Sequence, residues 1–232
     1  DEGEYSIEID PRSVDAEKLK VLREAGFNRI SLGVQDVNDE VQRAVNRKQS
    51  IELTGNVNQQ ARELGFRSVN MDLMYGLPYQ TVASFEQTLD TIIDMRPDRI
   101  AVYNYAHLPE RFKPQRRIDA ATLPTPDEKL SLLQHTIEHL TGSGYVYIGM
   151  DHFALRDVYR AVSHEQGCLQ RNFDVYSTLV FWDMVFLGWS AFGQVCDNYS
   201  QNVSLLESYY AMLDKVELPL KRGIELDPDD LL

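Results

Sequence analysis

Hydrophobic positions follow two alternating patterns along the chain. Short apolar or alternating runs are each followed by a segment with helical periodicity, and no hairpin signal separates one run from the next. This alternation is typical of βα units that build a parallel sheet. The predicted strands are Tyr5–Ile9, Arg29–Val34, Ser68–Met74, Arg99–Tyr105 and Tyr145–Gly149. The predicted helices are Asp15–Ala25, Ser50–Leu64, Thr81–Met95 and Pro126–Leu140, the last with an apolar stripe of Leu130, Leu133, Ile137 and Leu140 facing the sheet.

Polar residues stand where the predicted strands end. They are Glu8 and Asp10, Gln35 and Asp36, Asp72, Asn104 and His107, and Asp151 and His152. The carboxyl ends of parallel strands share one edge, and polar groups converging there are typical of the active face of a barrel. Helix caps and turns also favour these residue types, so the pattern alone leaves both interpretations open.

Composition narrows the function classes. The chain has 36 acidic and 23 basic residues, and its formal net charge of −13 disfavours nucleic acid and anionic membranes as partners. Its only cysteines are Cys168 and Cys196, too few for a disulfide framework or a three-cysteine cluster site. Such sparse cysteine usage indicates a cytoplasmic protein.

Both ends of the chain indicate a piece of a longer protein. The chain opens on Asp1 without a basic or strongly apolar leader, and it closes on a turn followed by an acidic helix cap. We therefore expect a domain over 1–217 and the start of a truncated helical domain over 218–232. The apolar stretch from Val175 to Phe192 holds Asp183 at its centre, which costs about 2.5–3.5 kcal/mol in a membrane, so we expect buried strand and loop there.

Several motifs resemble the oxygen-independent coproporphyrinogen III oxidases, which are radical S-adenosylmethionine (SAM) enzymes. The motifs shared with wider relatives are Gly33-Val34-Gln35 and Asp72-Leu73-Met74-Tyr75-Gly76-Leu77-Pro78. Those particular to the oxidases are the Gln35-Asp36 pair and Asn104-Tyr105-Ala106-His107-Leu108-Pro109 with its basic continuation. Further matches are Ser6 to Arg12, Val41 to Arg47 and Gly149 to Ala154, so the resemblance covers nearly the whole chain.

The resemblance implies a fold and an activity. It implies an α/β fold, a partial (β/α)6 radical-SAM-type barrel with parallel strands and outer helices whose first strands are missing. It implies that the intact enzyme binds a [4Fe-4S] cluster and two SAM molecules, takes electrons from a donor, and acts as a monomer. Its reaction would convert two propionates of coproporphyrinogen III to vinyl groups, giving protoporphyrinogen IX.

The resemblance also assigns residues to the cofactor. Glu8 would contact the first SAM molecule, and Gln35, Arg47, Asp72 and Ala106 the second. Independently of the family, the planar guanidinium of Arg47 suits a carboxylate, and Asp72 suits an ammonium or ribose hydroxyl. A helix-terminal cation at Arg47 and caps at Glu8 and Asp72 remain the alternative interpretations.

A basic cluster in an acidic chain provides the candidate substrate contacts. Its members are Arg111, Lys113, Arg116 and Arg117. Four substrate carboxylates require such partners, although an exposed solvated loop explains the charges equally well. No catalytic residue and no metal ligand is assigned, and His107 and His152 stay outside the site.

Departures from the family pattern limit the expected activity. The cluster-binding C-x-x-x-C-x-x-C loop is absent, so this chain alone should be inactive. The stretch from Asp174 to Gly193 also differs, with Val175, Leu179, Val180 and Phe186 at places where the family has other residues. Two alternatives remain, a haem-chaperone-like paralogue and an unrelated barrel enzyme with a metal held by Asp72, Asp151 and His152.

Overall fold

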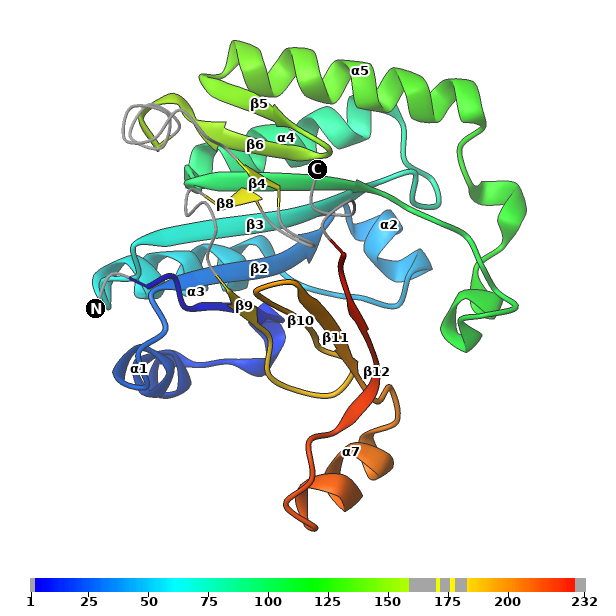
Figure 1. Ribbon diagram of the computed structural model, residues 1–232. Coiled ribbons are helices and arrows are strands. Elements are labelled where there is room, and N and C mark those ends of the chain that lie inside the picture. The colour runs from blue at the N-terminus through cyan, green and yellow to red at the C-terminus, as the bar shows by residue number, and fades with distance from the viewer. Residues whose placement is uncertain (1–2, 159–169, 172–175, 178–182, 228–232) are drawn as a thin grey trace. The chain divides into compact units, whose positions relative to one another are not determined.

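The computed structural model describes residues 3–158, 170–171, 176–177 and 183–227 (Figure 1). The chain divides into two compact units, Asp1–Ala161 and Val162–Leu232. Each unit is described by itself below.

Unit 1 is built on a six-stranded sheet with the order β1-β2-β3-β4-β6-β5. Its strands are β1 (Ser6–Ile9), β2 (Arg29–Gln35), β3 (Ser68–Tyr75), β4 (Arg99–Asn104), β5 (Tyr145–Gly149) and β6 (His152–Leu155). β1 to β4 pair in parallel in chain order, as the sequence predicts. The expected parallel α/β architecture is therefore confirmed over these four strands.

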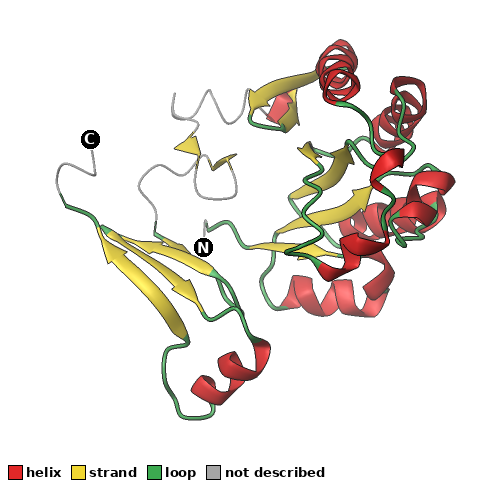
Figure 2. Ribbon diagram, turned by 90° about the vertical axis from the view of Figure 1, so that its right-hand side faces the viewer, coloured by secondary structure: helices red, strands yellow, loops and turns green. Residues whose placement is uncertain are grey.

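The helices that connect the strands lie along one side of the sheet (Figure 2). They are α1 (Ala16–Glu24), α2 (Asp39–Ala44), α3 (Ile51–Glu63), α4 (Val82–Met95) and α5 (Pro126–Gly142), with short 3₁₀ turns η1 (Pro11–Ser13), η2 (Lys113–Arg117) and η3 (Ala120–Thr122). Side chains of Asp15, Ser50, Thr81 and Thr125 cap the four longer helices by accepting from backbone N–H groups. These caps fix each helix start close to its predicted position.

The two faces of the sheet differ in polarity. Alternate residues such as Leu32, Met71 and Ile100 are fully buried on the face that packs against the helices. The strand register aligns Glu8 with Ser31 and Ser31 with Asn70, which places these side chains on the opposite face. Burial of the apolar set at about 25 cal/mol per Å² stabilises the unit, and the polar face is left for a ligand.

The predicted run of parallel strands ends at β4. β5 turns directly into β6, which runs antiparallel to it and lies between β4 and β5. Met150 and Asp151 form the turn with φ angles of 41° and 74°. The sequence analysis missed this hairpin because the left-handed positions carry Met and Asp rather than the Asn-Gly type pairs that signal such turns.

The buried side of α5 differs from the predicted stripe at Leu130, which is 63% exposed. Of the predicted stripe, Leu140 is fully buried and Leu133 and Ile137 pack against the core, so the prediction is confirmed except at Leu130. Leu132 and Thr136 are also buried, and Thr136 donates to the carbonyl of Leu132 (2.7 Å).

Unit 2 contains a four-stranded antiparallel sheet with the order β12-β11-β10-β9. Its elements are β9 (Met184–Val185), β10 (Phe192–Val195), β11 (Asn198–Asn202), α7 (Leu206–Leu213) and β12 (Leu220–Glu225), besides a short pair β7 (Gln170–Arg171) and β8 (Tyr176–Ser177).

The structure agrees with some of the expectations for the C-terminal part of the chain and differs from others. The segment expected to be a turn after residue 217 is strand β12, and the two units meet at 161/162. The domain limits 1–217 and 218–232 stay a prediction. The helix start after residue 227 and residues 174–175 and 178–182 of the divergent stretch lie outside the described residues. Over 183–192 the expected strand and loop are present, but the expectation that they are buried is wrong, since Val185, Leu187 and Trp189 are 67%, 90% and 53% exposed. Among the described residues, no helix is long and apolar enough to cross a membrane.

Candidate functional site

The site begins with an irregularity at the end of β2. The pairing of β2 with β3 shifts between Gly33 and Gln35, and Gln35 takes a left-handed φ of 69°. Such a bulge redirects a side chain at the end of a strand. A Cβ on Gly33 would lie 3.1 Å from Nη2 of Arg47 and 3.3 Å from Nε2 of Gln35. The absence of a side chain at Gly33 thus lets Arg47 and Gln35 approach the strand.

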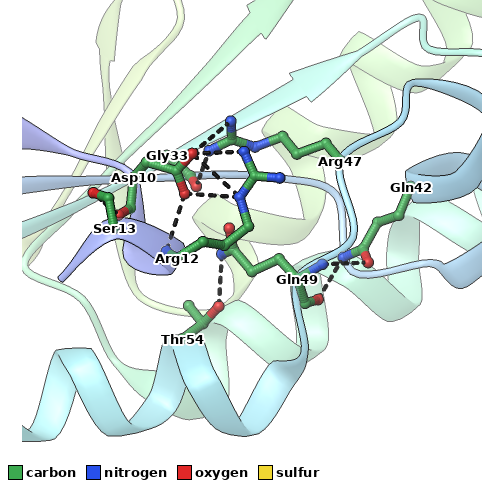
Figure 3. A network of polar contacts seen from close by, with 8 residues as sticks. All are labelled: Asp10, Arg12, Ser13, Gly33, Gln42, Arg47, Gln49 and Thr54. Carbon is green, nitrogen blue, oxygen red and sulfur yellow. Dashed lines mark hydrogen bonds and ion pairs between the residues drawn. The ribbon is translucent and has the colours of Figure 1, made fainter. Parts of the chain in front are cut away.

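Arg47 is fixed in place by two contacts (Figure 3). Its Nη2 donates to the carbonyl of Gly33 (2.9 Å), and its Nη1 lies 3.3 Å from Oδ2 of Asp10. Burial lowers the pKa of Arg47, and Asp10 opposes this shift. The guanidinium is still a cation at neutral pH, because arginine does not lose its proton in proteins.

Asp10 joins two arginines at the end of β1. Arg12 donates to it through Nη2 at 2.6 Å, and this hydrogen bond is the main cause that lowers the pKa of Asp10 to about 2. Asp10 is therefore an anion at any physiological pH. Its direct ion pair with Arg47 orients the guanidinium.

The loop that carries Arg47 is held by a buried amide. Nε2 of Gln42 donates to the carbonyls of Asp36 and Gln49, both at 2.8 Å, and its Oε1 accepts from the Gln49 N–H at 3.0 Å. Gln49 in turn donates to Thr54 of α3 at 2.8 Å (Figure 3). These hydrogen bonds hold the loop between α2 and α3 in one conformation. Because Arg47 lies on this loop, Gln42 is a positioning residue for Arg47.

Asp36, the neighbour of Gln35, is a structural residue. It is 1% exposed and accepts from Gln80 (2.5 Å), Thr88 (2.8 Å) and the backbone of Asn38 (2.7 Å). Burial raises its pKa, and these hydrogen bonds counter the shift. Asp36 therefore fastens the end of β2 to α4 rather than facing a ligand.

Gln35 and Arg47 line a cavity of about 400 Å³, a volume within the range of small-molecule sites. The other lining residues are Ala44, Val45, Asn46, Met74, Leu77, Tyr105, Pro114, Gln115, Arg117 and Ile118. Oε1 of Gln35 and Nε of Arg47 are shielded from solvent and have no hydrogen-bond partner. Buried polar atoms are normally paired, so an acceptor and a donor left open in one cavity fit a polar ligand such as SAM.

A second polar group occupies the sheet face near β3. Asp72 accepts from Ser31 (2.5 Å) and Asn70 (2.7 Å) and is 6% exposed. Burial raises its pKa to about 6, and the nearby charge of Glu8 adds to this shift. Burial has removed water from this carboxyl group, so a ligand with a cationic group or a hydroxyl could take the place of that water as its hydrogen-bond partner.

Ala106 does not line the cavity, but its backbone contacts a residue that does. Its carbonyl accepts from Nε2 of Gln115 at 3.0 Å, and Gln115 lines the cavity. The neighbouring carbonyl of Tyr105 accepts from Lys129 of α5 at 3.0 Å. Tyr105 stands in the Asn104–Pro109 motif and Gln115 in its basic continuation, so the resemblance covers both segments, but the sequence analysis assigned neither residue to the site.

The basic cluster divides around the cavity. Arg117 lines it. Arg111, Lys113 and Arg116 are exposed, and Nε of Arg116 donates to the Pro109 carbonyl at 2.9 Å. The alternative metal site is not formed, since among the described residues Asp72, Asp151 and His152 do not bring their ligand atoms within 4.8 Å of one another.

The structure thus joins part of the predicted set. Gln35 and Arg47 share one cavity with Arg117, and Ala106 borders it through Gln115. Glu8 and Asp72 do not line this cavity but lie on the polar sheet face. The predicted contacts of all these residues with SAM stay predictions.

Comparison with known proteins gives the family. Residues 1–92 match the model of the radical SAM superfamily. The chain is 54% identical over 230 residues to the oxygen-independent coproporphyrinogen III oxidase of Pseudomonas aeruginosa, and 49% identical over 231 residues to that of Escherichia coli. The solved coproporphyrinogen III oxidase of E. coli, described as a radical SAM enzyme, superimposes with a TM-score of 0.92 over 99% of the chain. The chain belongs to the oxygen-independent coproporphyrinogen III oxidase family.

The chain matches only part of the length of these relatives. The chain is covered over 99% and 100% by the two curated relatives but spans 50% of each of them, and it spans 53% of the solved structure. Radical SAM proteins use SAM with a [4Fe-4S] cluster. The polar sheet face and the cavity fit SAM, whereas two cysteines in the sequence do not fit the cluster.

Proposed function

We propose that this chain supplies part of the SAM-binding and substrate-binding surface of an oxygen-independent coproporphyrinogen III oxidase. The whole enzyme would oxidatively decarboxylate two propionates of coproporphyrinogen III to vinyl groups, giving protoporphyrinogen IX. SAM and its cluster, when bound, supply the oxidising radical for this reaction. The proposal includes a monomeric cytoplasmic enzyme that receives electrons from a separate donor.

The observation that carries the proposal is the pair of open polar atoms in the cavity. Gln35 and Arg47 both line the cavity, and Oε1 of Gln35, an acceptor, and Nε of Arg47, a donor, are shielded from solvent without a hydrogen-bond partner. We assign Arg47 to the carboxylate of the second SAM molecule, since its other nitrogens are already anchored. Gln35 would accept from an ammonium or ribose hydroxyl of that molecule.

The remaining contacts follow from the positions of the side chains. Asp72 would accept from the same SAM molecule, and Ala106 would border it with its backbone. Glu8 is exposed on the polar face and would contact the first SAM molecule. Each residue binds or orients a ligand, and we assign no proton transfer to any of them.

SAM binding to the chain tests the assignment of Arg47. Isothermal titration should show that Arg47→Gln lowers SAM affinity at least tenfold, because a charge-assisted contact is worth about 1.5–3 kcal/mol. Arg43→Gln is the matched control, since Arg43 lies on α2 just before the loop that carries Arg47 and pairs only with exposed Asp39 among the contacts described. Equal affinities for the two variants would contradict the assignment.

Substrate binding is tested separately with coproporphyrin III, a stable probe with the same carboxylates. Arg117→Gln should weaken binding more than Lys113→Gln, because both residues are exposed but only Arg117 lines the cavity. Fluorescence titration of the porphyrin measures both. If Arg43→Gln weakened binding as much as Arg117→Gln, the porphyrin would be responding to overall charge, and the basic cluster would not be the substrate site.

A further inference from the structure

A group of metal-ligand side chains lies between α4 and α5, apart from the cavity. Glu86, His135 and His139 each offer a ligand atom, and these three atoms lie within 4.8 Å of one another. They are the only such group among the described residues. α4 and α5 pack against each other on the helical side of the unit (Figure 1).

Helix geometry brings these side chains together. His135 and His139 are four residues apart on α5, so both face the same side, and their rings stack at 5.5 Å with a 23° interplanar angle. Glu86 and Asp90 have the same spacing on α4. Nε2 of His135 lies 3.3 Å from Oε2 of Glu86, and Nε2 of His139 lies 2.7 Å from Oδ1 of Asp90. One turn of each helix therefore faces one turn of the other.

We propose that Glu86, His135 and His139 form a binding site for a divalent transition-metal ion, best matched by Zn²⁺. Two imidazoles and one carboxylate are the protein ligands of many three-ligand zinc sites, with water in the fourth position. In a tetrahedral site with bonds of about 2.1 Å the ligand atoms lie about 3.4 Å apart. The three ligand atoms already lie within 4.8 Å of one another, so small side-chain rotations would bring them to this spacing.

The burial of the group favours a metal site over two separate ion pairs. The side chains of His135 and His139 are 27% and 22% exposed, so much of each imidazole is already removed from water. Nε2 of His135 is shielded from solvent and makes no hydrogen bond. Its ion pair with Oε2 of Glu86 at 3.3 Å lacks hydrogen-bond geometry, so a cation bound between the two would satisfy both groups better than the ion pair does.

Asp90 has a different role in the site. Of the three proposed ligands, Asp90 contacts His139, and its side chain is 60% exposed. Carboxylates that hydrogen-bond a ligand imidazole fix its orientation and raise its basicity. Asp90 is therefore a positioning residue for His139.

Zinc titration of the chain tests the site. After removal of metal with EDTA, the chain should compete with a chromophoric chelator for one equivalent of Zn²⁺. His135→Gln and Glu86→Gln should each weaken binding more than about 100-fold, because loss of an outer-shell partner alone costs about 10- to 100-fold. Co²⁺ in place of Zn²⁺ should give the visible absorption of a four-coordinate site, and the Glu86→Gln variant should lose it.

A matched control separates the site from general charge effects. Glu138→Gln removes a carboxylate next to His139 whose partner is Gln134, and it should leave Zn²⁺ affinity unchanged. Circular dichroism of each metal-free variant confirms folding, and Glu86 is exposed enough (44%) for its variant to fold. No uptake of Zn²⁺ by the unaltered chain, or one equivalent retained by both variants, would overturn the proposal.

Discussion

At the scale of single residues, one glycine controls the geometry of the cavity. Gly33 gives its carbonyl to Arg47 and leaves the space that a Cβ would need for the side chains of Arg47 and Gln35. Its backbone φ is not left-handed, so the requirement is for space alone. The sequence shows the Gly33-Val34-Gln35 motif, but it cannot show which of its atoms is approached.

We predict that Gly33→Ala weakens SAM binding without unfolding the chain. A Cβ only 3.1 Å from Nη2 displaces a flexible side chain by a few tenths of an ångström, so affinity should fall on the order of tenfold, about 1.4 kcal/mol. Titration calorimetry measures this. Gly55→Ala on α3 makes the same substitution where the nearest atom is 3.9 Å away, and it should keep full affinity. Unchanged affinity in Gly33→Ala would show that Arg47 does not contact the ligand.

Asp72 gives the chain a pH-dependent stability. Burial raises its pKa to about 6. Between the ordinary carboxyl pKa and about 6, the folded chain holds a proton that the unfolded chain has lost. The free energy of unfolding therefore decreases as pH rises through this window.

Asp72→Asn should remove that dependence. We expect the free energy of unfolding at pH 8 to increase by up to about 3 kcal/mol, from a shift of about two pKa units at 1.36 kcal/mol each. Urea unfolding between pH 4 and 8 measures the change. Asp94→Asn, at an exposed position of α4, should leave the pH profile as it is. A profile for Asp72→Asn parallel to that of the unaltered chain would show that Asp72 is not the group responsible.

At the scale of elements, hydrophobic periodicity predicts the strands and helices that are fixed by burial of their apolar faces. The parallel strands and the four long helices follow from apolar spacing and cap residues, so they were predictable within a few residues. The hairpin of β5 and β6 depends on two left-handed residues, Met150 and Asp151, whose types do not signal a turn. Likewise, the bulge at Gln35 is a property of pairing between strands and leaves no periodic trace.

The end of α7 carries a comparable backbone feature. Val216 has a φ of 61° and is 95% exposed, while its N–H donates to the carbonyl of Leu213 (2.8 Å) and the Glu217 N–H to that of Met212 (3.0 Å). This is the helix-end position where glycine is preferred. A β-branched residue there is strained by roughly 1–2 kcal/mol.

Val216→Gly should therefore raise the thermal unfolding midpoint of unit 2. The expected gain is about 1 kcal/mol, since relief of strain is partly offset by the extra freedom of glycine in the unfolded chain. Differential scanning calorimetry measures it. Val185→Gly offers the opposite case, because Val185 is an exposed residue of strand β9 and its replacement should destabilise. A lower midpoint for Val216→Gly would show that the left-handed turn does not limit stability.

At the scale of the whole molecule, the sequence indicates the family and the side of the sheet that binds, but not how the site divides. Glu8 and Asp72 lie on the polar face of the sheet, whereas Gln35 follows the bulge of β2 and Arg47 lies on the loop after α2, so their joint contact with one ligand stays a prediction. That Gln35 and Arg47 belong to a cavity that Asp72 does not line depends on side-chain packing around Tyr105 and Gln115. Distances of this kind are set by tertiary contacts between residues far apart in sequence.

The cysteine content leads to a prediction for the isolated chain. Radical SAM clusters need three thiolates, and the sequence has two cysteines. Anaerobic treatment with iron and sulfide should therefore yield no stoichiometric [4Fe-4S] absorption, while SAM binding at the cavity persists. One cluster per chain, with its characteristic spectrum, would contradict this expectation.

The opposite orientations of Gln35 and Asp36 have a consequence for genetics. Gln35 lines the cavity, whereas Asp36 is buried and hydrogen-bonded to Thr88 of α4. A residue proposed to bind the ligand is therefore directly followed by a residue that stabilises the fold. A screen for lost cofactor affinity should recover changes at both positions. A second substitution that raises the free energy of unfolding of the chain should restore cofactor affinity to variants at position 36. It should not restore affinity to variants at position 35.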